Sequence, residues 1–375
     1  MIAKTPPMGF NTWNTFAADI DEKMVMEMAD VMVAEGYRDA GYEYVVIDDC
    51  WSLRERDENG CLVADPAKFP HGIKYLSDYV HSKGLKFGMY SCAGTRTCAG
   101  FPGSFDHEYQ DARTFAEWGV DFLKYDYCYF PQYANGRHRY LTMAQALRAS
   151  GRDIVFSACN WGADAPWDWM RSIGAHMYRS TGDIVDTFES TAGIIRSQLD
   201  KFNANAPGCF NDIDMMTVGM YGAGNVGREQ CNTYDEYVTQ FAFWCFVGAP
   251  LMMGADLRKM DGACKALLQN RDLIALNQDP DCRPAWWLRD IHCGHLAMMR
   301  QLSDGTFAIG IFNLNDGGYH VEIPFTALGV PCGSGVKLAV TDLLTGEDLG
   351  ERQDDLFVTV EHHACRVFKV RFVTA

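Results

Sequence analysis

The stretch Phe122-Leu-Lys-Tyr-Asp-Tyr-Cys128 decides the fold. It starts as an apolar, β-prone run and ends abruptly in a lysine and a lone carboxylate, Asp126. The same design recurs along the first three-quarters of the chain, with helix-like segments in between. The other strand candidates that share it are 6–13, 45–51, 86–91, 154–161, 177–183, 209–215 and 250–256. Eight strands alternating with helices predict a (β/α)8 TIM barrel, the α/β fold class.

A barrel of this kind brings the carboxyl ends of its strands together at one face, where active sites are built. Polar residues follow the strand candidates at that end. They include Asp48, Asp49, Tyr90, Lys124, Asp126, Asn160, Arg179, Asp183 and Asp214. The sequence therefore predicts one pocket that is rich in carboxylates.

After a helical segment at 259–277, the alternation of strand and helix candidates ends. Short strand candidates follow at 295–301, 306–313, 319–324, 336–342, 356–360 and 364–370, separated by Gly-containing turns. We therefore expect a catalytic barrel over residues 1–287 and a C-terminal antiparallel β-sandwich over 288–375. The sandwich carries no catalytic constellation of its own, so its expected role is to pack against the barrel.

Bulk properties exclude several classes of protein. The net charge of −16 and the lack of a basic run argue against nucleic acid as a partner. The most apolar stretch, 241–254, is too short to cross a bilayer, so no membrane partner is expected. The N-terminus lacks an apolar leader, which favours a cytoplasmic location, with a trimmed secreted form as the alternative.

Several chemistries lack their sequence signals. The 14 cysteines form no Cys-x-x-Cys pair and no zinc-like spacing, so neither a metal nor a cofactor is expected. There is no Gly-x-Ser-x-Gly elbow, P-loop or dinucleotide fingerprint. Carboxylate chemistry remains, and two positioned acids can cleave a glycosidic bond.

Each acidic candidate has a structural alternative. Asp126 shares a strand face with Lys124, whose ammonium favours an ionised nucleophile, but the two could instead be an ion pair at the barrel mouth. Asp183 fits a proton donor or the N-cap of a helix from 184 onward. Asp48 and Asp49 fit a sugar diol or a metal.

Tryptophans accompany these acids. Trp13 and Trp51 stand at strand ends, and three more follow the fifth strand, at 161, 167 and 169. Core filling is the commoner use of a single tryptophan. Several of them beside acidic strand ends favour contact with the apolar face of a sugar ring.

Motifs along nearly the whole chain resemble those of glycoside hydrolase family 27, which contains α-galactosidases (melibiases) and α-N-acetylgalactosaminidases. They include Met8-Gly-Phe-Asn-Thr-Trp13, Ile47-Asp-Asp-Cys-Trp51, Leu123-Lys-Tyr-Asp126, Cys159-Asn-Trp-Gly162 and Arg179-Ser-Thr-Gly-Asp-Ile184. The resemblance implies a retaining double displacement on terminal α-galactosides, with Asp126 as nucleophile and Asp183 as acid/base. It implies substrate contacts from Trp13, Asp48, Asp49, Tyr90, Lys124, Asn160, Trp161, Ala163, Arg179 and Asp214.

The loop after the fifth strand decides which sugar the family accepts at carbon 2. Asn160 and Ala163 are a mixture of the patterns for a hydroxyl and for an acetamide. Galactose is favoured, while N-acetylgalactosamine, β-L-arabinopyranose and a catalytically silent sugar-binding barrel stay open. The loop at 220–225 is unusual for the family, and homo-oligomers are common in it.

The resemblance also bears on two cysteines. Cys98 and Cys128 match a pair that forms a disulfide beside the pocket in exported relatives. In a reducing cytosol they would tend toward thiols, so both states stay open.

Overall fold

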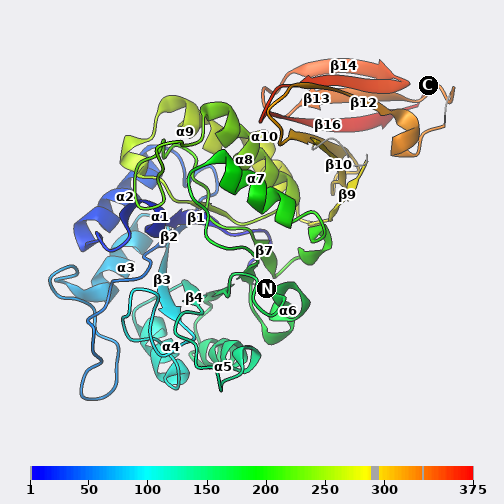
Figure 1. The fold of residues 1–375 in the computed structure, drawn as a ribbon. Helices are drawn as coiled ribbons and strands as arrows, with labels where there is room; N and C mark the ends of the chain where they lie inside the picture. Colours follow the sequence, from blue (N-terminus) through cyan, green and yellow to red (C-terminus); the bar gives the residue numbers. More distant parts are fainter. Residues whose placement is uncertain (1, 289–294, 332, 375) are drawn as a thin grey trace.

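The computed structural model describes residues 2–288, 295–331 and 333–374. Its first part is a ring of eight parallel strands with helices around the outside (Figure 1). The strands are β1 (Met8–Asn11), β2 (Tyr44–Val46), β3 (Lys86–Cys92), β4 (Phe122–Asp126), β5 (Val155–Cys159), β6 (Met177–Arg179), β7 (Phe210–Asp212) and β8 (Leu251–Met253). The predicted (β/α)8 barrel is confirmed, although the strands are shorter than the sequence pattern suggested.

The ring closes just beyond β7. The hydrogen-bonded order runs β7-β6-β5-β4-β3-β2-β1-β8, and Met216 then forms a parallel bridge with Met253. The Met216 amide donates to the Met252 carbonyl at 2.8 Å, and the Gly254 amide donates to Met216 at 3.1 Å. This closure brings the loop after β7 next to the loops after β8 and β1.

Helices connect the strands and cover the ring. They are α1 (Trp13–Phe16), α2 (Glu22–Ala34), α3 (Gly72–Ser82), α4 (Glu108–Glu117), α5 (Gly136–Ala149), α6 (Met170–Ile173), α7 (Phe188–Ser197) and α8 (Tyr234–Val247). Thr233 starts α8 with a reciprocal capping box, in which its side chain bonds the Glu236 amide and Glu236 bonds back. No helix within the described ranges combines the length and the apolar character needed to span a bilayer.

The helical segment expected at 259–277 is divided. It consists of α9 (Gly262–Leu268) and α10 (Arg271–Asn277). The break falls at Asn270, whose side chain accepts from the Asp272 and Leu273 amides and so caps a new helix. Helical spacing of apolar residues continues across the break, which is why the pattern alone did not show it.

The C-terminal part is a β-sandwich, as expected (Figure 1). A six-stranded antiparallel sheet, ordered β14-β13-β16-β11-β10-β9, faces the β12-β15 pair. The strands are β9 (Ala285–Trp287), β10 (His295–Gln301), β11 (Phe307–Asn313), β12 (Tyr319–Pro324), β13 (Lys337–Asp342), β14 (Asp348–Gln353), β15 (Asp355–Val360) and β16 (Cys365–Val373). The two edge strands of the larger sheet, β9 and β14, were not expected. The domain division at residue 287 stays a prediction. Strand β9 lies just before that division in the sequence, yet it pairs with β10 of the sandwich.

The sandwich packs on the barrel through α8. Phe243 and Phe246 lie edge-on to Phe312 of β11. Arg300 of β10 is buried at 2% exposure, and its guanidinium donates to the Phe246 carbonyl at 3.1 Å. The contact is thus an apolar interface with a buried polar anchor.

Candidate active site

A cavity of about 330 Å³ opens at the carboxyl ends of the barrel strands. A larger one, of about 560 Å³, lies at the opposite end around Lys86 and Asp121. Barrel enzymes build their sites at the carboxyl ends, so the smaller cavity is the candidate. Most of the predicted residues line it: Trp13, Asp48, Asp49, Tyr90, Cys98, Lys124, Asp126, Trp161, Arg179, Asp183 and Asp214.

Three predicted residues are not among those that line the cavity: Asn160, Ala163 and Cys128. Asn160 is 1% exposed, and its side-chain amide donates to the Ala163 carbonyl at the turn that follows β5. Asn160 thus stabilises the loop that carries Trp161. The part that Asn160 and Ala163 play at carbon 2 of a sugar stays a prediction.

Asp126 ends β4 at the floor of the cavity, where it is 5% exposed. Its carboxylate accepts from the Tyr90 hydroxyl and from the Tyr127 amide, each at 3.0 Å. Burial raises the pKa of Asp126 to about 6, while the positive charge of Lys124 acts in the opposite direction. The group is therefore a buried carboxylate that ionises near neutrality.

The Lys124 ammonium pairs with Asp48 rather than with Asp126. It lies 2.9 Å from the Asp48 Oδ2, which also accepts from the side-chain amide of Asn11 at 2.8 Å. Burial lowers the pKa of Lys124, but the neighbouring Asp48 more than offsets this, so the pKa lies above its usual value. The pair is a fixed polar wall beside Asp126.

Asp49 has both carboxylate oxygens occupied. Oδ1 accepts from the Cys50 amide at 2.7 Å, and Oδ2 accepts from the Ala99 amide at 2.9 Å. Burial raises its pKa, and these two bonds oppose the rise. Asp49 thus connects the end of β2 to the loop that carries Cys98.

Arg179 joins two more carboxylates on the far side of the cavity. Its guanidinium lies 2.8 Å from Asp183 and 2.7 Å from Asp214. The Asp183 side chain is 71% exposed, whereas Asp214 is buried, and burial raises the Asp214 pKa to about 6 against the pull of Arg179. Thr187, not Asp183, caps the following helix α7.

Three residues around the cavity have backbones in the left-handed region. The φ angles are +72° at Cys50, +55° at Trp161 and +90° at Asp214. Non-glycine residues rarely adopt this conformation, and strained positions of this kind concentrate at functional sites. Of the tryptophans in the sequence pattern, Trp13 and Trp161 line the cavity, whereas Trp51 and Trp169 are buried in the core.

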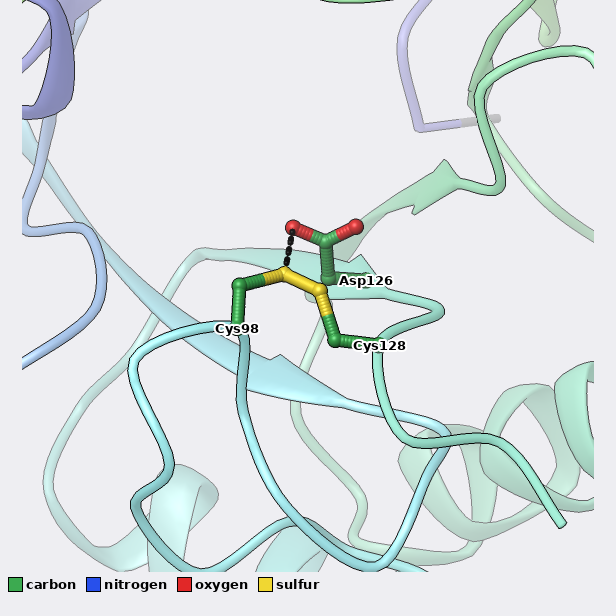
Figure 2. Close-up of side chains that lie close together, drawn as sticks. All are labelled: Cys98, Asp126 and Cys128. Carbon is green, nitrogen blue, oxygen red and sulfur yellow. Dashed lines mark hydrogen bonds between the residues drawn. A yellow bond between two sulfur atoms is a disulfide. The ribbon is translucent and has the colours of Figure 1, made fainter.

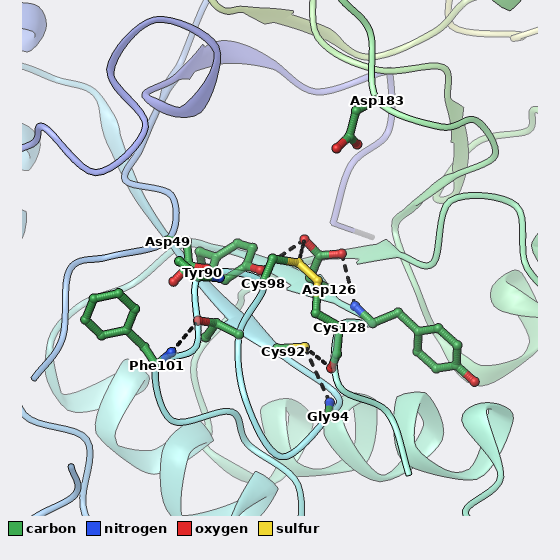
Figure 3. Close-up of a disulfide and its surroundings, with 12 residues drawn as sticks. Asp49, Tyr90, Cys92, Gly94, Cys98, Phe101, Asp126, Cys128 and Asp183 are labelled. Carbon is green, nitrogen blue, oxygen red and sulfur yellow. Dashed lines mark hydrogen bonds between the residues drawn. A yellow bond between two sulfur atoms is a disulfide. The ribbon is translucent and has the colours of Figure 1, made fainter. Parts of the chain in front are cut away.

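Cys98 and Cys128 form a disulfide directly beside Asp126 (Figure 2). The Cys98 sulfur lies 3.5 Å from the Asp126 Oδ2. In the described part of the chain, the potential metal-ligand atoms of Cys98, Asp126 and Cys128 lie within 4.8 Å of one another. The two sulfurs are bonded to each other in the disulfide, so they are not thiolate ligands here. In Figure 3 the carboxyl of Asp183 points into the opening above Asp126 and the disulfide.

Seven lining residues were not among the sequence candidates: Asn14, Ile184, Val185, Met215, Asn225, Val226 and Arg228. Four of them directly follow a motif residue in the chain. Asn225, Val226 and Arg228 belong to the loop between β7 and α8, of which the sequence marked only residues 220–225 as unusual. Such a loop has no regular period, so only the fold places it at the cavity.

Two sequence families match most of the chain, and solved structures match it as well. The family described as "Alpha galactosidase A" matches residues 5–279, and "Alpha galactosidase C-terminal beta sandwich domain" matches residues 296–370. Alpha-galactosidase A of Cellvibrio japonicus is 46% identical over 291 residues, covering 74% of this chain and 68% of its own. Alpha-galactosidase 2 of Arabidopsis thaliana is 40% identical, covering 98% of this chain and 89% of its own.

A solved structure agrees in both domains. The crystal structure of alpha-galactosidase I from Mortierella vinacea has a TM-score of 0.93 at 32% identity, covering 100% of this chain and 98% of that one. The barrel and the sandwich are thus both shared with this structure. The chain belongs to the α-galactosidase family of glycoside hydrolases.

Proposed function

We propose that this enzyme removes terminal α-linked galactose from oligosaccharides or glycoconjugates by a retaining double displacement. The observation that carries the proposal is the pair of unlike carboxylates at one cavity. Asp126 is buried and hydrogen-bonded at its floor, and Asp183 is exposed at its edge. Two carboxylates in different surroundings are what a nucleophile and an acid/base need.

The reaction would take two steps. Asp126 attacks the anomeric carbon while Asp183 protonates the departing oxygen, which leaves a galactosyl ester on Asp126. Asp183 then takes a proton from a water molecule, and the resulting hydroxide attacks the anomeric carbon from the side that the leaving group vacated. This attack breaks the ester bond to Asp126 and releases galactose with its α configuration retained. The Tyr90 hydroxyl and the Tyr127 amide stabilise the Asp126 carboxylate before attack and after release.

The walls of the cavity support recognition of a sugar. The charged Lys124–Asp48 pair offers both donors and acceptors to ring hydroxyls, and Trp13 offers an apolar face. The burial of Asp48, Tyr90 and Asp126 at the floor supports removal of one terminal unit at a time. A cytoplasmic location, a homo-oligomeric state and the lack of a nucleic-acid partner remain part of the proposal.

A parallel assay tests the choice of sugar. The p-nitrophenyl glycosides of α-galactose, α-N-acetylgalactosamine and β-L-arabinopyranose are compared by kcat/KM. We expect the α-galactoside to dominate, because the relatives that this chain matches over most of its length are α-galactosidases. Faster turnover of the acetamido or arabinose substrate would reassign the specificity, and no turnover of any would favour a binding protein.

Replacing the nucleophile separates turnover from binding. Asp126→Asn should lower kcat by roughly a thousandfold or more while galactose still protects the protein against thermal unfolding. Asp78→Asn, an exposed change on α3, is the control and should retain activity. Near wild-type turnover in Asp126→Asn would contradict the assigned role.

The hydrogen bond from Tyr90 predicts a pH effect. Because the Asp126 pKa is raised to about 6 and its ionised form attacks, kcat/KM should fall as the pH drops through about 6. Tyr90→Phe removes a donor to the ionised form, so the acid limb should move upward by roughly one pH unit. An acid limb that stays in place, or moves down, would show that the bond does not stabilise the carboxylate.

Reduction of Cys98–Cys128 should leave most of the activity. Other bonds hold the two backbones: the Ala99 amide donates to Asp49 at 2.9 Å beside Cys98, and the Cys128 carbonyl accepts from the Cys92 thiol at 3.2 Å. Activity is measured after dithiothreitol treatment, with thiol titration to verify reduction. Loss of most activity would mean that the bridge itself holds the nucleophile in place.

A further inference from the structure

The loop at 220–232 is built into the mouth of the cavity. Its Val226 amide donates to the Asn14 carbonyl at 3.0 Å, in the short helix α1 that follows β1. The Val226 carbonyl in turn accepts from the Asp186 amide at 3.0 Å, on the segment after β6. The loop therefore joins both sides of the mouth and runs next to the Asp183 segment.

The buried side chain of Asp186 holds this loop through hydrogen bonds. It is 0% exposed, and its carboxylate accepts from the Gly222 amide at 2.8 Å, the Asn232 side chain at 3.0 Å and the Tyr237 hydroxyl at 2.9 Å. Three donors satisfy a buried charge that would otherwise be costly. Each donor fixes a different point of the loop or of the helix α8 that follows.

The loop is also tightly packed. A Cβ on Gly227 would lie 2.0 Å from the Gly222 carbonyl oxygen, and one on Gly224 would lie 2.7 Å from the Thr15 Cα. Gly224 has a φ of +79°, which favours glycine. A side chain at either position would therefore displace the backbone of this loop.

The loop presents Arg228 to the cavity. The two other cations that line it are neutralised, Lys124 by Asp48 and Arg179 by Asp183 and Asp214. Arg228 is exposed and donates to the Gly227 carbonyl at 2.7 Å. Among the residues that the structure describes, no carboxylate lies within ion-pair distance of its guanidinium.

Depth in the cavity assigns Arg228 to the leaving group. The nucleophile Asp126 lies at the buried floor, and the galactosyl ring must reach it. Asp183, which protonates the leaving oxygen, and Arg228 both lie at the exposed mouth. The part of the substrate beyond that oxygen, the aglycone, would therefore lie beside Arg228.

We propose that Arg228 binds a carboxylate on the leaving-group part of the substrate, so that the enzyme prefers α-galactosides with an anionic aglycone. The inference rests on the proposed function and adds a specificity to it. A guanidinium offers paired donors that match a carboxylate. A chain with a net charge of −16 otherwise repels anions, which makes an unpaired arginine at the mouth informative.

The test uses two substrates that differ in one group. In both, α-galactose is attached to oxygen 6 of an open-chain aglycone, either neutral glucitol or anionic gluconate. Galactose release gives kcat/KM for each at low ionic strength. The wild type should prefer the gluconate by roughly fivefold, the upper range of an exposed ion pair, and 0.5 M salt, about the order that screens such pairs, should reduce the preference.

Variants assign the preference to Arg228. Arg228→Met should bring the gluconate-to-glucitol ratio to one or below, while Arg228→Lys keeps part of it. Arg371→Met, an exposed change on β16 of the sandwich, should leave the ratio as in the wild type.

Two different failures can be told apart. Equal rates on both substrates, or a preference that persists in Arg228→Met, overturn the role of Arg228 while the galactosidase assignment stands. Failure to release galactose from either substrate and from p-nitrophenyl α-galactoside overturns the proposed function itself.

Discussion

Closure of the strand ring is the constraint on which the site depends. Eight parallel strands have their carboxyl ends at the same edge of the sheet, and the bridge between Met216 and Met253 closes that sheet into a ring. Without that bridge the segment that carries Asp214 would lie at an open sheet edge. With it, Asp48 after β2, Asp126 from β4 and Asp183 after β6 share one cavity, although they are far apart in the sequence.

Within that cavity, the carboxylates differ in whether a lysine or arginine side chain pairs with them. Lys124 is engaged by Asp48, and Arg179 is shared between Asp183 and Asp214. Within the described residues no cation forms an ion pair with Asp126, whose carboxylate accepts hydrogen bonds from Tyr90 and Tyr127. A buried carboxylate without a bound cation retains a free lone pair for attack, so the neighbouring ion pairs do not compete with the reaction.

Sequence patterns predicted the parts that follow a regular period. Apolar strands ending in polar residues located all eight barrel strands and most of the cavity. The partner of Lys124 was not predicted, because spacing within β4 suggests Asp126, whereas the fold brings in Asp48 from the segment that follows β2. Edge strand β14 was missed because its residues are mostly exposed and do not alternate. Arg228 was missed because its loop takes its shape from Asp186 and from tight glycine packing, neither of which has a sequence period.

The central claim is that Asp126 forms a covalent bond to the sugar. The most direct measurement is mass spectrometry of peptides from enzyme treated with a fluorinated galactosyl fluoride, in which the extra ring fluorine slows hydrolysis of the intermediate. The account predicts inactivation together with a galactosyl label on the peptide that contains Asp126, and release of the label on standing. A label on another carboxylate such as Asp183 or Asp48, or turnover without any label, would contradict it.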